Sequence, residues 1–512
     1  MTDSLTHAMA FYITTPIYYV NAAPHLGHAY TAIAADALAR HHRQRGEDVF
    51  FLTGTDEHGE PVALAAEREG VTPQELADRN AERFRALMPL LDVSNDFFIR
   101  TTDEGHKVRV QEVLQRVHDN GHVYKGTYEG WYCPRCADFK TGNEIGPDDT
   151  CPIHEIPLLW EEEDNWFFRL SSFQDDLERL YREQPDFVQP RQRYNEALSF
   201  ITGGLNDVSL SRSKLTWGVT VPWDPEHVFY VWFDALLNYY TALGYARDGQ
   251  DLTDEFWPAT FHIIGKDILK FHTVFWPAML LAAGIPLPEH VFVHGFLLMR
   301  DASGRDFKMS KSLGNVLDPF QIIEQFGTDA LRYYCLREVS FGQDGGVSTA
   351  GFAARYEGEL ANELGNLASR TTSMAARYLD GTVPAVELDA DLVAELAPIP
   401  GEVAALLDKA ELTAALEAAW RAVRRLNRYV EEQAPWSLAK AGDDEAVARV
   451  LATLVEGLRV VAVLLHPWMP ASTAKIRDAL GAPDLDYAGA TPAAGTVRTV
   501  ERLPPLFPKH DA

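Results

Sequence analysis

The chain has 512 residues, of which 46% are hydrophobic, 11% aromatic and 23% charged, and its formal net charge is −28 at pH 7. This length is too great for one hydrophobic core and predicts roughly two to four domains. The acidic balance excludes a surface that coats nucleic acid with general positive charge, although a local basic stripe would still allow salt-sensitive, Mg²⁺-assisted RNA binding.

The start of the chain and its apolar runs bear on its location. Met1-Thr2-Asp3-Ser4 lacks the basic and apolar regions of a secretion signal, and no apolar run approaches the length of a membrane span. We therefore expect a cytoplasmic protein with no membrane segment.

The first third of the chain alternates expected strands with expected helices. Apolar runs predict buried strands over residues 11–15, 49–53 and 97–101. Helical periodicity predicts helices over residues 29–45, 73–91 and 104–120. This is the βαβ rhythm of a parallel nucleotide-binding sheet.

A histidine motif, Pro24-His25-Leu26-Gly27-His28, follows the first expected strand and opens the first expected helix. Backbone N–H groups and the dipole at a helix N-terminus favour phosphate. Gly27 would let a purine or phosphate approach the backbone without a Cβ in the way. Alone, the motif is equally compatible with an ordinary turn.

The βαβ rhythm breaks at about Gly121 and resumes near Val219, which predicts a Rossmann-type domain split by an insertion of about a hundred residues. Inside the insertion lie four candidate ligands in two short pairs: Cys133, Cys136, Cys151 and His154. Two thiolate and imidazole pairs suit a closed, structural, tetrahedral Zn²⁺ site. The alternative is two unrelated turns with reduced cysteines. The remaining cysteine, Cys335, lies in an apolar helical run and is expected to pack in a core.

After the insertion, strands are expected over residues 227–234, 261–267 and 290–298, with a helix over residues 269–283. A lysine loop follows, Phe307-Lys308-Met309-Ser310-Lys311-Ser312-Leu313-Gly314-Asn315. Lys308 and Lys311 would bring mobile charges to leaving phosphates from a loop that closes over the site. From about Ala350 onward, long amphipathic helical patterns replace the strand signal.

Together, with a large insert between them, the histidine motif and the lysine loop resemble the paired motifs of class I aminoacyl-tRNA synthetases. Four further segments resemble the methionyl-tRNA synthetase family in particular, and the resemblance extends from about Phe11 to Pro508. These segments are residues 14–28, 55–59, 231–239 and 265–272.

The resemblance implies an α/β fold: a class I Rossmann-type parallel sheet split by a zinc-bearing insertion, followed by an all-α helical-bundle anticodon-binding domain. The expected division places the catalytic domain at 1–120 and 219–318 and the insertion at 121–218. A stem-contact segment at 319–349 and the helical domain at 350–512 complete it.

The implied activity is ATP-dependent activation of L-methionine, with release of pyrophosphate, followed by transfer to initiator and elongator methionine tRNAs. Cofactors would be one structural Zn²⁺ and the Mg²⁺ that accompanies ATP, held mainly by phosphates and water. The resemblance assigns catalysis to His25, His28, Lys308 and Lys311. It assigns ATP binding to these four residues and to Asn21, Gly27, Lys266, Asp267 and Ser310.

The methionine pocket implied by the resemblance consists of Ile17, Tyr19, Asp56, Trp232, Ala235, Tyr239, Phe271 and His272. A flexible thioether favours an apolar and aromatic wall, and sulfur–aromatic contact adds about 0.3–1.5 kcal/mol. The Asp56 carboxylate suits the substrate ammonium group, whereas Tyr239 and His272 could direct polar contacts at sulfur. Without the resemblance, the aromatic residues would be read as core. Leu236 stands where some family members carry proline.

By resemblance, Asn366, Arg370 and Trp436 contact the anticodon. Asn366 and Arg370 are four residues apart and share a helix face, and Pro435 places Trp436 at a helix bend or end. Aromatic stacking with amide and guanidinium hydrogen bonds is how unstacked bases are commonly read. A basic stripe at helical spacing is either a phosphate track or a solvated face: Arg421, Arg424, Arg425 and Arg428.

Three other functions remain open from the sequence. Class I synthetases for leucine, isoleucine or valine usually carry a larger insertion than this one, and a cysteine-specific enzyme is a further possibility. A nucleotidyltransferase without tRNA would not need the helical third, and a catalytically silent tRNA-binding or zinc-dependent interaction protein would be expected to show damaged motifs. The chain stops soon after Leu506 without the extra dimerising module of many family members, so a monomer is expected.

Overall fold

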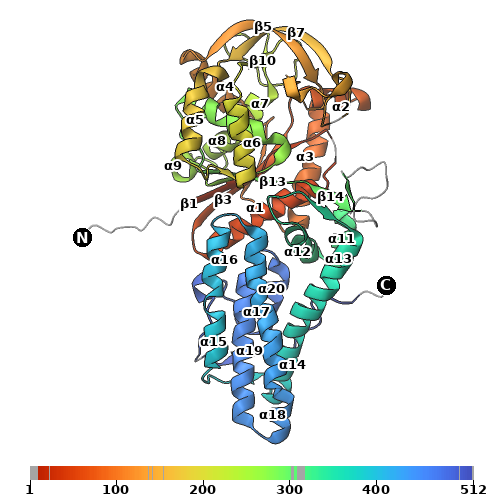
Figure 1. Ribbon diagram of the computed structural model, residues 1–512, viewed down its shortest axis with the longest axis vertical. Coiled ribbons are helices and arrows are strands. Elements are labelled where there is room, and N and C mark those ends of the chain that lie inside the picture. Colours follow the sequence, from red (N-terminus) through yellow and green to blue (C-terminus); the bar gives the residue numbers. More distant parts are fainter. Residues whose placement is uncertain are drawn as a thin grey trace, which may run out of the picture.

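The computed structural model describes residues 10–21, 23–136, 138–140, 142–153, 155–300, 305–307, 318–494 and 496–509. A parallel β-sheet lies across the middle of the molecule, with the insertion on one side and a helical region on the other (Figure 1). Its strands are β1 (Ala10–Thr14), β2 (Tyr18–Tyr19), β3 (Asp48–Asp56), β4 (Phe97–Arg100), β8 (Val188–Gln189), β12 (Phe261–Gly265) and β13 (His290–His294).

The strand order is β3–β1–β12–β13–β8, and both β2 and β4 pair with β3. Every pairing in this sheet is parallel. The first strand of the chain therefore lies inside the sheet, and the order reverses on either side of β1. Such a switch point opens a crevice at the carboxyl ends of the strands.

The alternation of side chains along β1 separates two cores. Phe11 and Ile13 pack in one apolar cluster with α1 (Leu26–Gln44), whereas Tyr12 packs in another cluster with α4 (Glu104–Asp119) and α10 (Trp276–Ala283). Both faces of the strand are buried, as expected for a parallel sheet covered by helices on both sides. The continuous apolar runs in the sequence follow from this arrangement.

The insertion forms its own antiparallel sheet in the order β6–β5–β7–β9. These strands are β5 (Val123–Cys133), β6 (Asp138–Lys140), β7 (Leu159–Phe168) and β9 (Val208–Ser209). Helices α5 (Gln174–Glu183) and α6 (Arg191–Thr202) lie between β7 and β9 in the chain. Between those two helices the chain returns to the main sheet, where β8 pairs with β13. The insertion is thus anchored to the main sheet through β8.

The strand expected over residues 227–234 is wrong for most of its length. Only β11 (Val228–Phe229) is extended, and α7 (Val231–Ala235) begins directly after Tyr230. The helical turn buries the carboxylate of Asp234 where His58 and His106 contact it at 2.6 and 2.8 Å. This long-range polar network, invisible in the local pattern, outweighs the strand propensity of the aromatic and β-branched run.

The strand expected over residues 290–298 is divided at Gly295. β13 ends at His294, and β14 (Leu297–Arg300) belongs to a separate sheet with β15 (Asp306–Phe307) and β16 (Gly345–Val347). A Cβ on Gly295 would lie 2.3 Å from the backbone of Gln343. The glycine therefore permits the close approach of the later segment. The helix expected over residues 269–283 likewise begins with a π-helical turn, Phe271–Phe275, before α10.

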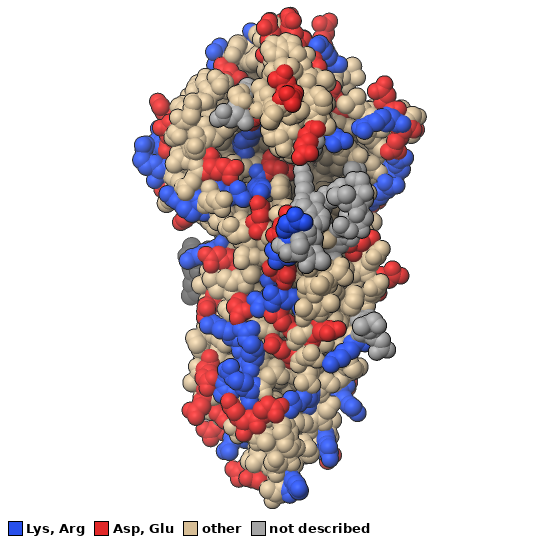
Figure 2. Space-filling view, turned by 45° about the vertical axis from the view of Figure 1, so that its right-hand side comes forward, with Lys and Arg blue, Asp and Glu red and all other residues tan. Residues whose placement is uncertain are grey.

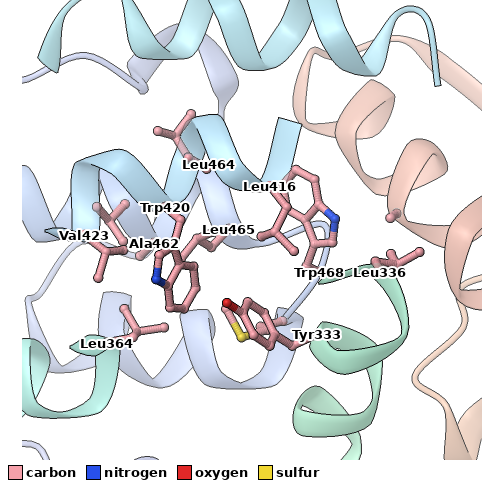
Figure 3. Packing of buried hydrophobic residues seen from close by; sticks show 14 of the residues in the cluster. Tyr333, Leu336, Leu364, Leu416, Trp420, Val423, Ala462, Leu464, Leu465 and Trp468 are labelled. Atoms are coloured by element: carbon pink, nitrogen blue, oxygen red, sulfur yellow. The ribbon is translucent and has the colours of Figure 1, made fainter. Parts of the chain in front are cut away.

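From α11 onward the described chain is mostly helical, and its longest helices pack into a bundle (Figure 1). The helices are α11 (Pro319–Phe326), α12 (Thr328–Glu338), α13 (Thr349–Arg355), α14 (Asn366–Tyr378), α15 (Ala390–Leu396), α16 (Ile399–Leu407), α17 (Leu412–Gln433), α18 (Pro435–Ala441), α19 (Asp444–Leu465) and α20 (Pro470–Ala479), with a π-helical segment, Tyr356–Gly365, between α13 and α14. Figure 3 shows their shared core, in which Tyr333 lies beside Trp420 with ring centroids 4.8 Å apart. This apolar cluster is continuous with the α1 face of the sheet, so bundle and sheet share one core.

None of the helices within the described ranges combines the length and the apolar character needed to cross a bilayer.

Candidate functional site

The histidine motif forms the start of α1. His25 is the N-cap residue in an extended conformation, and its Nδ1 accepts the N–H of Gly27 at 3.1 Å. Nδ1 of His28 accepts the N–H of His25 at 3.2 Å, and the two rings stack with centroids 3.8 Å apart. Because Nδ1 accepts in both neutral rings, Nε2 is the protonated nitrogen of each. The motif therefore presents two imidazole N–H donors beside a helix N-terminus, which suits an anion.

A cleft of about 360 Å³ opens at this helix N-terminus, along the carboxyl ends of β1, β3 and β12. This is the switch-point position expected for a nucleotide site. The cleft brings together twelve of the residues predicted from the sequence: Ile17, Tyr19, Asn21, His25, Gly27, His28, Asp56, Trp232, Ala235, Tyr239, Asp267 and His272. Lys266 and Phe271 line an adjoining pocket of about 390 Å³ that shares Tyr19 and Trp232 with the cleft.

An aromatic wall closes one end of the cleft. The rings of Trp232 and Phe271 stack in parallel at 3.7 Å, and Tyr19 meets Trp232 edge-on at 6.3 Å. The Tyr239 hydroxyl donates to Nε2 of His272 at 2.7 Å, while Nδ1 of His272 donates to the Ile268 carbonyl at 3.0 Å. Burial lowers the pKa of His272 to about 4, so this wall is uncharged at neutral pH. An uncharged aromatic wall suits a thioether or another apolar side chain.

The cleft that this wall closes is also lined by the carboxylate of Asp56. Asp56 ends β3 and is 3% exposed, and its Oδ1 has no hydrogen-bond partner among the described residues. Burial, with the nearby charge of Asp234, raises the pKa of Asp56 well above its ordinary value. A buried carboxylate with an unused oxygen is a site for a cation.

Asp234 behaves in the opposite way although it is equally buried. Burial alone would raise its pKa, but His58 and His106 outweigh that effect and hold the pKa at about 2. The two buried carboxylates thus differ in their neighbours: Asp234 has partners, whereas Asp56 has an oxygen left for a ligand.

Several residues that line the cleft were missed by the sequence reasoning: Arg135, Asn238, His294 and Phe296. Asn238 is three residues after Ala235 and one before Tyr239, so helical spacing could have identified it. His294 is at the carboxyl end of β13, where parallel strands place functional groups, but the expected strand continued to residue 298 and so concealed this position. Arg135 stands between the two cysteines of the first pair, and no sequence signal placed it at the cleft.

The lysines have two different outcomes. Lys308, Ser310 and Lys311 lie outside the described residues. Lys266 donates to Asp344 at 2.6 Å, and its Nζ lies 4.5 Å from the ring centroid of Phe296. Lys266 is therefore occupied by an ion pair beside the cleft.

Three thiols converge in the insertion. The sulfur atoms of Cys133, Cys136 and Cys151 lie within 4.8 Å of one another, and those of Cys136 and Cys151 are 3.6 Å apart. The fourth predicted ligand, His154, lies outside the described residues. A cluster of three thiols is a suitable donor set for a soft or borderline metal ion. Cys335 is buried in α12, as predicted, and burial raises its pKa to about 12.

The residues predicted to contact the anticodon gather near the junction of α17 and α18. The Arg370 guanidinium lies 5.5 Å from the Trp436 ring centroid, and its Nη1 is 2.8 Å from Oε1 of Glu431. Asn366 begins α14 and is exposed, and Trp436 is 39% exposed. An exposed indole beside a guanidinium is an arrangement that can stack on a base.

Glutamates pair with much of the predicted basic stripe on α17. Arg421 contacts Glu402, Arg424 contacts Glu417, and Arg425 contacts Glu395. Positive and negative side chains are correspondingly interleaved over the helical region (Figure 2). These pairs favour the solvated-face interpretation over a phosphate track.

Comparison with known proteins gives consistent matches along the chain. The family model described as "tRNA synthetases class I (M)" matches residues 11–157 and 148–372, and "Anticodon binding domain of methionyl tRNA ligase" matches residues 381–502. The methionine–tRNA ligase of Rhizobium meliloti is 45% identical over 98% of this chain and 98% of that protein. The corresponding ligase of Caldanaerobacter subterraneus is 45% identical over 92% of this chain and 74% of its own length.

Solved structures of Mycobacterium tuberculosis methionyl-tRNA synthetase also match. The complex with methionyl-adenylate has a TM-score of 0.92 and 44% identity, and covers 98% of this chain and 100% of that one. The free-state structure has a TM-score of 0.84 and 41% identity, and covers 99% of each chain.

Proposed function

The chain belongs to the methionyl-tRNA synthetases of class I, and on that premise we propose how its cleft activates L-methionine with ATP and loads it onto methionine tRNA. In the first step a methionine carboxylate oxygen attacks the α-phosphorus of ATP. The new oxygen–phosphorus bond forms as the bond to the β-phosphate bridge breaks, and pyrophosphate leaves. In the second step a hydroxyl of the tRNA 3′-terminal ribose attacks the methionyl carbonyl, loses its proton, and AMP leaves.

The observation that carries the proposal is the meeting of two half-sites in one cleft. Asp56 offers an oxygen to the ammonium group, and Trp232, Tyr239 and His272 line the side-chain half of the same cleft. Phe271 stacks on Trp232 from the adjoining pocket. At the other half, His25 and His28 direct imidazole donors from the helix N-terminus, where negative charge develops on the triphosphate. Holding carboxylate and phosphate together accounts for much of the acceleration of such a transfer.

The remaining ATP contacts are assigned by family membership. Lys308 and Lys311 are proposed to neutralise the leaving pyrophosphate and Ser310 to donate a hydrogen bond to it, with Mg²⁺ bound through phosphates and water. Asn21, Gly27 and Asp267 line the cleft and fit the nucleotide half. Lys266 would have to exchange its Asp344 partner for a phosphate.

The cysteine cluster is proposed to hold one structural Zn²⁺, with His154 as the fourth ligand. The support is the convergence of three sulfur atoms within 4.8 Å and the turn-rich segment between the two pairs. Bound zinc would supply cross-linking rather than catalysis, because a site with four protein ligands leaves no open position. The knuckle would then keep Arg135 at the edge of the cleft.

The division of labour along the chain is part of the proposal. Residues 1–120 and 219–318 would form the catalytic domain, 121–218 the insertion, 319–349 the stem contact and 350–512 the anticodon-binding domain. Asn366, Arg370 and Trp436 would read anticodon bases, supported by the exposed Trp436 ring beside Arg370. A monomeric state, a cytoplasmic location and use of both initiator and elongator tRNAs remain predictions.

Pyrophosphate–ATP exchange with each amino acid, without tRNA, tests the activation step. Exchange with methionine alone supports the proposal, whereas exchange with none would favour a catalytically silent tRNA-binding protein. His28→Ala is expected to slow exchange by about 100-fold, the typical cost of one donor to developing charge. His118→Ala, a histidine outside the cleft, is the matched control and should retain the rate.

A further inference from the structure

Asn238 carries a buried amide oxygen without a partner at the wall of the cleft. The residue is 1% exposed and lines the cleft, and its Oδ1 has no hydrogen-bond partner among the described residues. Its Nδ2 donates to the Ala235 carbonyl at 2.6 Å. This bond fixes the amide so that the oxygen is the atom left over. A buried acceptor without a donor is costly, and a ligand that donates an N–H or O–H removes the cost.

The helical spacing shows which part of the cleft Asn238 faces. The backbone stays helical from α7 through α8 (Asn238–Thr241), so Ala235, Asn238 and Tyr239 share one face. All three line the cleft. Ala235 and Tyr239 belong to the proposed methionine half, which places Asn238 in that half.

The chemistry of a buried ammonium group requires more than one acceptor. Such a group carries three N–H donors, and Oδ1 of Asp56 supplies one acceptor oxygen. A methionine molecule has no other strong donor, because its carboxylate and thioether only accept. The indole Nε1 of Trp232 is also unpartnered within the described chain, so the same half of the cleft offers a donor for the carboxylate.

We propose that Oδ1 of Asn238 is a second acceptor for the α-ammonium group of methionine, beside Asp56. The proposal rests on the methionine specificity proposed above. An amide is better suited here than a second acid: Asp234 already raises the pKa of Asp56, and another carboxylate would raise it further. Asn238 thus adds a hydrogen bond without adding charge.

Two substitutions separate the oxygen from the nitrogen of this amide. Asn238→Ala removes both, whereas Asn238→Asp keeps an acceptor and loses the donor to Ala235. If the oxygen binds ammonium, the alanine variant should bind methionine about 10- to 100-fold more weakly, and the aspartate variant should bind it more tightly than the alanine variant at high pH. Equal losses in both variants would mean that Nδ2 only fixes the turn, and would overturn the proposal.

Two analogues separate an ammonium contact from other contacts. Methioninol keeps the ammonium group and lacks the carboxylate, whereas 4-(methylthio)butanoate keeps the carboxylate and lacks the ammonium group. The binding of each analogue is measured by its inhibition of pyrophosphate exchange. Asn238→Ala should weaken the binding of methioninol about as much as that of methionine and should leave the binding of 4-(methylthio)butanoate unchanged. Equal weakening of both analogues would contradict the assignment.

ATP also carries N–H and O–H donors, namely the adenine amino group and the ribose hydroxyls. The KM for ATP tests whether one of these groups contacts Asn238 instead of the ammonium group. A rise in that KM, with methionine affinity retained, would place Asn238 against the nucleotide and overturn the ammonium contact. Asn120→Ala is the matched control, because its amide also donates to a backbone carbonyl, that of Ala282, away from the cleft. Methionine-dependent exchange by the unsubstituted protein tests the proposed function separately.

Discussion

Two neighbouring buried aspartates, of which only Asp56 lines the cleft, differ because of what surrounds each. Asp234 is paired with two histidines and stays ionised, whereas burial leaves Asp56 with a raised pKa and an unused oxygen. The free protein therefore binds a proton at Asp56 at pH values where an exposed aspartate would be ionised. The substrate ammonium group can form an ion pair only after that proton leaves.

Methionine binding is consequently expected to depend on pH through Asp56. Because its pKa is raised in the free protein and lowered by the bound ammonium, affinity should fall as the pH falls through the raised pKa, and binding should release a proton. Calorimetry in buffers of different ionisation enthalpy measures that release. Asp56→Asn should weaken binding by about 1.5–3 kcal/mol and abolish the proton release. Binding by the unsubstituted protein with no proton exchanged would contradict this account.

Residue identities were largely predictable where a motif carried them. Twelve predicted residues line the cleft. They could be predicted because the histidine motif and the strand-end segments are long and specific. The role inferred for Asn238 could not be read in the same way. Its Oδ1 becomes informative only because Nδ2 is bound to Ala235 and no described donor reaches the oxygen.

Elements were predictable where burial follows a regular period. The helix expected over residues 104–120 is α4 at Glu104–Asp119, because one apolar stripe faces one core. The strand prediction for residues 227–234 was wrong because the apolar residues of this run are buried on all sides. Periodicity cannot distinguish a strand from a helix in such a run. What decides the conformation there is the contact of Asp234 with His58, far earlier in the chain.

The cluster of Cys133, Cys136 and Cys151 joins the antiparallel sheet of the insertion to the cleft edge. Cys133 ends β5, and the same turn carries Arg135 to the cleft. Cys133→Ser should abolish stoichiometric zinc, measured by elemental analysis, and lower the thermal midpoint, because metal binding and local folding are one process. Cys335→Ser, at a buried cysteine away from the cluster, should retain the metal. A Cys133→Ser protein with a full equivalent of zinc would refute the ligand set.

The turn between α17 and α18 positions the residues that are predicted to contact the anticodon. Ala434 adopts φ 41° between the two helices, and this sharp turn exposes Trp436 beside Arg370. Trp436→Ala should lower kcat/KM for tRNA charging by the equivalent of about 1–3 kcal/mol, which is the contribution of one stacked base. It should leave the rate of pyrophosphate exchange unchanged. Trp160→Ala removes an exposed indole from β7, outside the segments proposed to contact tRNA, and is the matched control. Unchanged charging by Trp436→Ala would show that this surface does not read the anticodon.

At the scale of the whole molecule, one buried arginine joins three parts of the chain. Arg332 on α12 donates to the Pro467 and Trp468 carbonyls in the turn between α19 and α20, at 2.7 and 3.1 Å. It also donates to Leu91 at 3.0 Å and pairs with Asp36 on α1 at 2.6 Å. The helix that begins with His25 and the helical bundle are therefore connected through a single guanidinium group.

Both carboxylate oxygens of Asp36 have partners at this junction. Burial would raise the pKa of Asp36, but Arg332 and Arg40 outweigh it and lower the pKa, so the carboxylate is ionised at neutral pH. Ser94 donates to the second carboxylate oxygen through its N–H and hydroxyl, at 2.7 and 2.6 Å. A buried pair of this kind contributes little net stability when whole, but it is costly to break on one side only.

Breaking it on one side is therefore the sharpest test of how the two halves are joined. Arg332→Met fills a similar volume but leaves the Asp36 carboxylate with less positive charge, and should lower the free energy of unfolding by about 3–5 kcal/mol in urea. Arg179→Met, which breaks an exposed pair with Asp176, should cost less than about 1 kcal/mol. The double variant Asp36→Asn/Arg332→Met should recover part of the loss, since neither charge then remains buried alone. The single variant Asp36→Asn completes the comparison. If the double variant loses as much free energy of unfolding as the two single variants added together, Arg332 acts through its carbonyl contacts alone and is not coupled to the carboxylate on α1.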